Sequence, residues 1–151
     1  MNLITPLLQP ANVLADLETT SKKRLFEQIG QLFATSYGLA ATEVFESLFA
    51  REKLGSTALG YGIAIPHGRI KHLKETACAF IRLKTPTDFD APDNQPVDLV
   101  FFLLAPAAAT DLHLQILGEL AAMFSDETFR ARLRAAPSAE ALYSLIAEWT
   151  P

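Results

Sequence analysis

The sequence predicts a layered α/β domain. Segments with strand-like and helix-like patterns alternate along most of the chain, and helices close it. Residues 97–104, Val-Asp-Leu-Val-Phe-Phe-Leu-Leu, barely alternate between apolar and polar side chains, which indicates a central strand covered by helices on both faces. The chain has 151 residues and is 50% hydrophobic, which is typical of one compact domain with its own core.

A strand and a helix are expected first. Residues 12–18 have the pattern of a short strand. The helix that follows has Thr20 or Ser21 available as its N-cap and Gly38 just past its end. Its apolar side chains recur at helical spacing, at Leu25, Phe26, Ile29, Leu32 and Phe33.

A second helix, 41–53, and a short strand, 62–65, are expected next. Gly55 is the expected C-terminal stop of the helix, and Pro66 ends the strand. His67 is then expected in a loop at the C-terminal end of this strand. One face of the helix carries the apolar side chains of Val44, Phe45, Leu48 and Phe49.

Two longer strands, 77–83 and 97–104, lead to the helical end of the chain. From about Asp111 the apolar pattern is helical in three pieces, 111–124, 126–135 and 138–149, the last of which begins at Ser138. No repeat, low-complexity tract or long linker divides the chain, so one domain is expected.

Composition and charge argue against several classes of protein. The 17 acidic and 13 basic residues give a net charge of −4, which argues against a nucleic-acid or anionic-membrane binder. The single cysteine, Cys78, rules out an intrachain disulfide and a multi-cysteine zinc site. The longest apolar run is far shorter than the roughly 20 residues of a membrane helix, and no signal peptide is readable. We therefore expect a soluble, cytoplasmic protein without membrane insertion.

The signatures of nucleotide-dependent and metal-dependent enzymes do not occur in the sequence. Residues 60–65, Gly-Tyr-Gly-Ile-Ala-Ile, begin like a dinucleotide fingerprint, but the last position is isoleucine and the segment precedes a strand instead of opening a helix. Walker A, His-Glu-x-x-His and Gly-x-Ser-x-Gly motifs are absent. We therefore expect neither a cofactor nor a metal.

His67 is the leading candidate for chemistry. It lies between Pro66 and Gly68, in a window that holds four of the seven glycines, where a partner can approach the backbone closely. Residues 51–74 contain five basic side chains and one acidic side chain, so this segment carries +4 in a chain of −4. A neutral imidazole is a nucleophile, and cations stabilise the oxygens of a phosphoryl group in transfer. The segment therefore suits a phosphoryl group on His67, and a turn residue without chemistry is the alternative.

Three further residues near His67 in the sequence are candidates for binding the phosphoryl group. The Arg51 guanidinium matches phosphate oxygens bidentately, although a cation at the end of a helix is also expected for structural reasons. Ser56 and Thr57 follow Gly55, and their hydroxyls suit either a phosphate or an ordinary turn.

His113 is the second candidate imidazole. Thr110 or Asp111 is expected to cap a helix, which places His113 in the first turn, where the helix dipole disfavours an imidazolium ion. The alternative is a histidine that packs on the apolar face of this helix. Because the carboxyl ends of strands meet at one edge of an α/β sheet, we expect the His113 and His67 rings to lie within about 8 Å of each other.

The remaining polar features are expected to be structural. His72, which lies between lysines, suits a solvated surface, and Cys78 suits the core. The acidic stretch is too irregular for a calcium loop and suits a solvated connection between strands. Its members are Asp88, Asp90, Asp93 and Asp98.

Residues 51–68, Arg-Glu-Lys-Leu-Gly-Ser-Thr-Ala-Leu-Gly-Tyr-Gly-Ile-Ala-Ile-Pro-His-Gly, resemble a known signature. It is the phosphorylation site of the EIIA domains of the bacterial phosphoenolpyruvate phosphotransferase system, mannitol/fructose type. Residues 89–97, Phe-Asp-Ala-Pro-Asp-Asn-Gln-Pro-Val, and 113–117, His-Leu-Gln-Ile-Leu, agree with it. The resemblance covers nearly the whole chain and is strongest to the nitrogen-regulatory EIIA, often called PtsN. It implies one EIIA domain over 1–151, with a mixed, mostly parallel sheet and helices on both sides.

The resemblance also implies a role for each motif residue. His67 would be the phosphoacceptor of a phosphotransferase, receiving its group from the phosphohistidine of a small HPr-like carrier, and Arg51 and His113 would belong to the active centre. No fused transporter or carrier segment is present in the sequence, which favours the regulatory, nitrogen-type branch and a nitrogen-type carrier. The alternatives are a fructose- or mannitol-type EIIA that passes the group to a transporter EIIB domain, and a non-enzymatic regulatory module switched by phosphorylation. The sequence identifies neither the EIIB acceptor nor the regulatory target.

Overall fold

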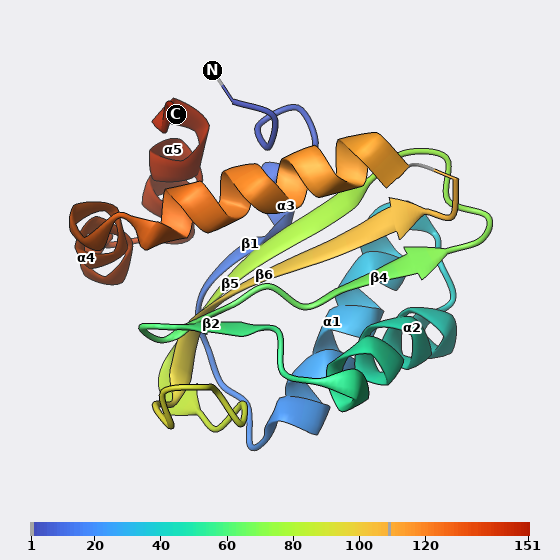
Figure 1. Ribbon diagram of the computed structural model, residues 1–151, viewed down its shortest axis with the longest axis horizontal. Coiled ribbons are helices and arrows are strands. Elements are labelled where there is room, and N and C mark those ends of the chain that lie inside the picture. The colour runs from blue at the N-terminus through green and yellow to red at the C-terminus, as the bar shows by residue number, and fades with distance from the viewer. Residues whose placement is uncertain (1, 109) are drawn as a thin grey trace.

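The computed structural model describes residues 2–108 and 110–151. Within them the chain forms a six-stranded sheet with helices on both sides (Figure 1). The strands are β1 (Val13–Leu17), β2 (Ala58–Gly60), β3 (Ile63–Ala64), β4 (His67–Ile70), β5 (Ala77–Thr87) and β6 (Val97–Pro106). The helices are α1 (Lys22–Tyr37), α2 (Ala41–Leu54), α3 (Thr110–Ser125), α4 (Glu127–Ala135) and α5 (Ala139–Glu148), and a short 3₁₀ helix, η1 (Pro10–Asn12), precedes β1.

The sheet is mixed, as expected. Its strand order is β1-β5-β6-β3-β2, and β4 also pairs with β6. β1 runs parallel to β5, and both β3 and β4 run parallel to β6, whereas the β5–β6 and β2–β3 pairs are antiparallel. Ile63 pairs with Leu99 and His67 with Leu103, so β3 and β4 follow one another along the same edge of β6.

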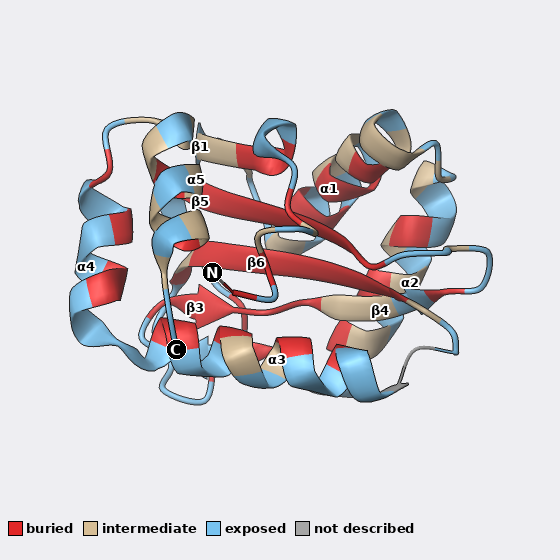
Figure 2. Ribbon diagram, turned by 90° about the horizontal axis from the view of Figure 1, so that it is seen from above, coloured by how far each residue is buried: buried red, intermediate tan, exposed pale blue. Residues whose placement is uncertain are grey.

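β6 is the central strand that its sequence predicts. Every residue of β6 except Asp98 and Pro106 is buried, because helices cover both faces of the sheet (Figure 2). α1 and α2 lie on one face, and α3, α4 and α5 lie on the other (Figure 1). Each face has its own apolar cluster, and the neighbours Phe101 and Phe102 on β6 contribute to opposite clusters.

The helix ends predicted from capping residues are confirmed for α1, α2 and α5. The Ser21 side chain accepts a hydrogen bond from the Arg24 amide, and Gly38 ends α1 in the left-handed conformation, with φ of 68°. Gly55 follows α2, and the Ser138 side chain caps α5. In α3, Asp111 lies inside the first turn, and the predicted cap at Thr110 falls on a side chain outside the described part of the chain.

The expectation that His67 lies in a loop is wrong. The chain leaves β3, passes through Ile65 and Pro66, and immediately forms β4, of which His67 is the first residue. The sequence of β4, His-Gly-Arg-Ile, lacks an apolar alternation of its own, and the strand exists because its backbone pairs with residues 103–106 of β6. β2 was not expected for the same reason, since its three residues depend on pairing with β3.

No helix among residues 2–108 and 110–151 is long and apolar enough to cross a membrane.

Candidate active site

A hollow of about 600 Å³ is lined by residues of α2, β4 and α3. In Figure 1, α2 lies next to β4 on one face of the sheet, and α3 lies on the other face. The hollow brings together His67, His113 and Arg51 from three different elements. The side chains and backbone that line it belong to Ser47, Ala50, Arg51, Leu54, His67, Gly68, Arg69, His113, Leu114 and Leu117.

The His67 ring is held by one backbone contact. Its Nδ1 lies 2.8 Å from the carbonyl oxygen of Ile65, and because a carbonyl only accepts, Nδ1 carries the proton of the neutral ring. Nε2 therefore keeps its lone pair. Burial lowers the pKa of His67 below its usual value, more than the hydrogen bond to Ile65 raises it, and the positive charge of Arg51 lowers it further. The ring is accordingly a neutral nucleophile at pH 7.

His113 lies next to His67, as expected. The centres of the two rings are 5.7 Å apart, within the predicted limit. His113 is only 6% exposed, and its Nδ1 is buried without a partner among the described residues. Burial lowers the pKa of His113, and the neighbouring His67 and Arg69 lower it further. Because an orphaned buried N–H is rarer than an orphaned acceptor, the neutral tautomer with its proton on Nε2 fits this environment, which leaves an N–H available for an oxyanion.

Arg51 occupies the last turn of α2, where it has the structural role expected of a cation at a helix end. Its Nη1 donates to the carbonyl of Gly55 at 2.8 Å, so the cation lies at the negative end of the helix dipole. The same side chain lines the hollow beside His67. The guanidinium has further N–H groups, which are suited to a phosphoryl oxygen.

Arg69 is a site residue that the sequence analysis missed. It lies two positions after His67 on β4, so the two side chains share one face of the strand. Its Nη1 donates to the carbonyl of Ala107 at 2.8 Å, and its side chain lines the hollow. The alternation rule would have found Arg69 if residues 67–70 had been recognised as a strand.

Gly68 permits the close approach of α2 to β4. A Cβ atom at this position would overlap the Ser47 hydroxyl and crowd the Ser47 backbone. That hydroxyl donates to the carbonyl of Arg69 at 2.9 Å, which fixes the helix against the strand. Gly68 therefore allows α2 to pack closely on β4. This packing sets the distance between Arg51 on the helix and His67 on the strand.

The structure does not place Ser56 and Thr57 in the hollow. The Ser56 hydroxyl donates to the carbonyl of Phe89 at 2.7 Å, and the Thr57 hydroxyl donates to Glu52 at 2.6 Å. Both hydroxyls thus hold the segment after α2 in place, which favours a structural role over phosphoryl binding. A turn or loop role was the alternative for both, and their internal hydrogen bonds agree with it.

Most of the features expected to be structural are so, but Asp98 lies within β6 and is half-buried, not in a solvated connection between strands. His72 is exposed, and Cys78 is fully buried in the core, where burial raises the pKa of its thiol. Within the acidic stretch, Asp93 accepts a hydrogen bond from the Tyr61 amide at 3.0 Å, and Asp98 pairs with Arg134 at 3.0 Å.

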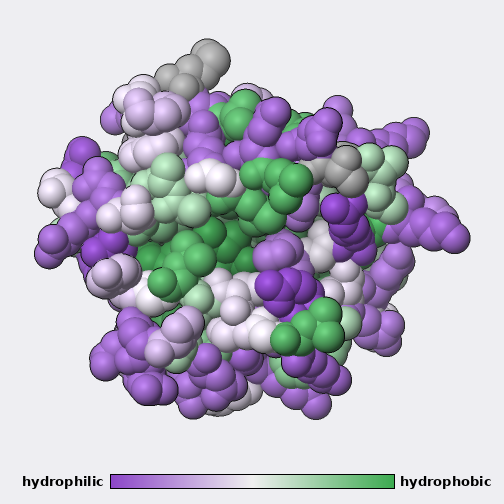
Figure 3. All heavy atoms as spheres, viewed as in Figure 1, coloured by the Kyte–Doolittle hydropathy of each residue, from purple (hydrophilic) through white to green (hydrophobic). Residues whose placement is uncertain are grey.

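Two leucines at the rim of the hollow are unusually exposed. Leu54, the last residue of α2, is 86% exposed, and Leu114 in α3 is 66% exposed. Figure 3 shows hydrophobic side chains at the surface across the middle of this face, surrounded by hydrophilic ones. Exposed apolar side chains around a reactive group are typical of a surface that meets another protein.

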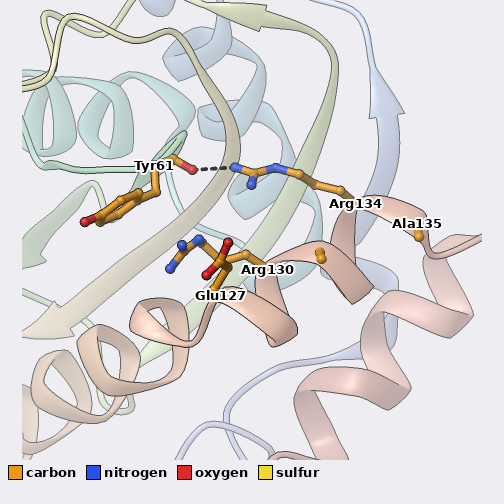
Figure 4. A pocket seen from close by; sticks show the side chains of 6 residues that line it. Tyr61, Glu127, Arg130, Arg134 and Ala135 are labelled. Carbon is orange, nitrogen blue, oxygen red and sulfur yellow. Dashed lines mark hydrogen bonds between the residues drawn. The ribbon is translucent and has the colours of Figure 1, made fainter.

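A second hollow, of about 580 Å³, lies between α4 and the turn that joins β2 to β3 (Figure 4). The Arg130 guanidinium lies 4.4 Å from the centre of the Tyr61 ring and donates to the carbonyl of Phe124, in the last turn of α3, at 2.9 Å. Arg134 donates to the carbonyl of Tyr61 and pairs with Asp98. These contacts bind the β2–β3 turn to α3 and α4. The described residues that line this hollow include no histidine.

Comparison with known proteins gives the family. The model of the family described as "Phosphoenolpyruvate-dependent sugar phosphotransferase system, EIIA 2" matches residues 6–149. This chain belongs to that EIIA family. It is 48% identical over 143 residues to the nitrogen regulatory protein of Pseudomonas aeruginosa. The aligned region covers 94% of this chain and 93% of that protein.

Two other relatives describe the range of the family. The crystal structure of the nitrogen regulatory protein IIA-Ntr from Neisseria meningitidis superposes with a TM-score of 0.92 at 48% identity, covering 96% of this chain and 99% of that one. The 2-O-α-mannosyl-D-glycerate-specific EIIABC component of Escherichia coli is 35% identical over 149 residues, which is 97% of this chain and 22% of that longer protein. The chain is thus an EIIA protein with nitrogen-regulatory homologues, and EIIA proteins are phosphoryl-transfer components.

Proposed function

We propose that this chain is a phosphohistidine relay, in which His67 accepts a phosphoryl group from the phosphohistidine of an HPr-like carrier. The observation that carries the proposal is the geometry of the His67 ring. Its Nδ1 is engaged by the Ile65 carbonyl, and the ring lines a hollow that also contains His113 and Arg51. The neutral ring therefore has its lone pair on Nε2, ready for an in-line attack.

The transfer needs no proton from the protein. The Nε2 lone pair of His67 forms the new P–N bond, and the P–N bond to the carrier's ring breaks with its electron pair remaining on the carrier's nitrogen. The Ile65 carbonyl continues to accept a hydrogen bond from Nδ1–H, which stabilises the phosphorylated ring. Arg51 and the His113 N–H then stabilise the charge on the phosphoryl oxygens.

The donor that this surface suits is a protein. The exposed side chains of Leu54 and Leu114 provide apolar contact area at the rim, and Arg51 and Arg69 provide positive charge inside it. The open hollow allows another protein's imidazole to reach His67, and burial of the two leucines on docking would exclude water from the transfer.

We assign the chain to the nitrogen-regulatory branch, as one EIIA domain over 1–151 that acts in the cytoplasm with a nitrogen-type carrier. The higher identity to the nitrogen regulatory protein of P. aeruginosa than to the mannosylglycerate transporter supports this assignment. In this branch, phosphorylation of His67 changes which regulatory proteins bind. A sugar-specific EIIA that donates to an EIIB domain is the second candidate, favoured by the match to the EIIABC component.

The decisive experiment is incubation of the chain with phosphoenolpyruvate, the first enzyme of the system and either a nitrogen-type or a sugar-type carrier. We expect one phosphoryl group per chain by intact-mass spectrometry, transferred faster from the nitrogen-type carrier. The adduct should be labile in acid and stable in alkali, because the bond is a phosphoramidate. An acid-stable adduct would contradict the assignment to a histidine, and a preference for the sugar-type carrier would favour the second candidate.

His113 is expected to assist transfer more than binding. Its N–H contact matters most as charge moves onto the phosphoryl oxygens. We therefore expect His113→Ala to raise the activation free energy of transfer by about 1.5 kcal/mol, which slows transfer roughly tenfold, and to change the carrier affinity less. Single-turnover transfer rates and calorimetric binding of the unphosphorylated carrier separate the two effects. His72→Ala, on the exposed surface, is the matched control. Equal losses in rate and affinity would show that His113 serves docking alone.

A further inference from the structure

We propose that Glu52 is a positioning residue for His67 and acts on it through Thr57 and Ile65. The inference rests on the proposed function, because it assigns a role to Glu52 in the reactivity of the His67 ring. The Glu52 carboxylate lies outside the hollow, and a continuous set of hydrogen bonds joins it to the ring. Its negative charge also raises the pKa of His67 directly.

Glu52 is a buried carboxylate with a complete set of partners. It lies in the last turn of α2, directly after Arg51, and is 4% exposed. Its oxygens accept from the Thr57 hydroxyl at 2.6 Å and from the Thr57 amide at 3.2 Å, and they pair with the Lys22 ammonium at 3.1 Å. A buried charge is stable only with such partners, so this carboxylate fixes Thr57 firmly against the end of α2.

The hydrogen bonds continue from Thr57 to the reactive ring. The Thr57 carbonyl accepts from the Ile65 amide at 3.1 Å, and the Ile65 carbonyl in turn accepts from Nδ1 of His67 at 2.8 Å. Glu52 and Thr57 determine the position of Ile65. The Ile65 carbonyl then determines which nitrogen of the His67 ring keeps its proton.

The same carboxylate also links the elements that carry Arg51 and the His67 ring. Arg51 and Glu52 are adjacent on α2, whereas Thr57 belongs to the segment that leads to His67. By joining Glu52 to Thr57, the structure couples the helix end that carries Arg51 to the strand that carries the nucleophile. A displacement of about 1 Å at a reacting group can slow a reaction by roughly a hundredfold, so this coupling affects the rate without contact with the phosphoryl group.

Two variants weaken this path in different ways. Glu52→Gln keeps the shape of the side chain but removes its charge, which leaves Lys22 without its buried partner. Thr57→Val removes only the hydroxyl that donates to Glu52, and Thr57→Ser restores a hydroxyl. Glu18→Gln is the matched control, because it removes the same charge from an exposed ion pair with Lys84.

The measurement is the tautomer of His67 in the free protein, by ¹⁵N NMR of the ring nitrogens across a pH titration, together with the transfer rate from a phosphorylated carrier. In the wild-type protein and in Glu18→Gln we expect the proton on Nδ1. In Glu52→Gln and Thr57→Val we expect a mixture of tautomers and a transfer rate lower by roughly 10- to 100-fold. Thr57→Ser should restore both.

Folded Glu52→Gln and Thr57→Val proteins that keep the wild-type tautomer and rate would overturn the positioning role. If Glu52→Gln does not fold, the comparison of Thr57→Val with Thr57→Ser decides alone, since a purely structural role would change stability without changing the tautomer. If no carrier phosphorylates the wild-type protein, the proposed function fails, and the tautomer measurement on the free protein still decides the role of Glu52.

Discussion

Replacement of His67 by alanine is expected to abolish phosphorylation and to leave the chain folded. The variant lacks the nucleophile, and His113 does not replace it, because its Nε2 carries the proton and its lone pair is on the buried Nδ1. The ring contributes one hydrogen bond, to Ile65, at the edge of an open hollow. Its loss costs about 1 kcal/mol, a small part of the roughly 5–15 kcal/mol that keep a domain folded.

The test is intact-mass spectrometry of His67→Ala after incubation with the phosphorylated carrier. His72→Ala is the matched control, since it removes an exposed histidine from the same part of the chain and should be phosphorylated normally. A thermal melt close to that of the wild-type protein establishes that the variant is folded. A phosphoryl adduct on folded His67→Ala would refute the assignment of the phosphoacceptor.

Replacement of Arg51 by alanine is expected to slow transfer from the carrier without preventing it. The loss of one charge-assisted contact to a phosphoryl group costs about 1.5–3 kcal/mol, or roughly 10- to 150-fold in rate. Arg51→Lys should recover only part of this, because an ammonium does not make two parallel contacts. The guanidinium also has a second task at Gly55, and a lysine fits that contact less well.

Single-turnover transfer rates measure this effect, and Lys53→Ala is the matched control. Lys53 is a cation in the same last turn of α2, but it does not line the hollow around His67. Its replacement removes the same charge and should leave the transfer rate nearly unchanged. If Arg51→Ala and Lys53→Ala behave alike, Arg51 acts only through the net charge of the helix end, and its proposed contact with the phosphoryl group is wrong.

The helices and the longer strands could be predicted from the sequence because their signals are local. Ser21 and Gly38 bound α1 through contacts within a few residues of each other, and the apolar run of β6 is complete in itself. The prediction that His67 and His113 are neighbours is confirmed, although His67 begins β4 beside Leu103 and does not lie at the carboxyl end of a strand.

The short strands and the supporting residues of the site could not be predicted in this way. β4 has four residues with a glycine and two polar side chains, and only its pairing with β6 makes it a strand. Arg69 was missed for this reason. Ser56 and Thr57 were assigned to a phosphate because hydroxyls after a glycine suit either role, and the partners that decide between the roles, Glu52 and Phe89, became known only from the structure.

By itself, the sequence determined the order of helices and long strands, the burial of β6 on both faces, and the candidate nucleophile, His67. The tertiary structure alone decided which nitrogen of that histidine holds the proton and where Arg69 points. It also decided that Glu52 joins α2 to the segment before His67. The physical reason is that these properties depend on hydrogen bonds to groups brought close by folding. A tautomer is selected by the carbonyl that reaches the ring, and a strand by the edge on which it pairs.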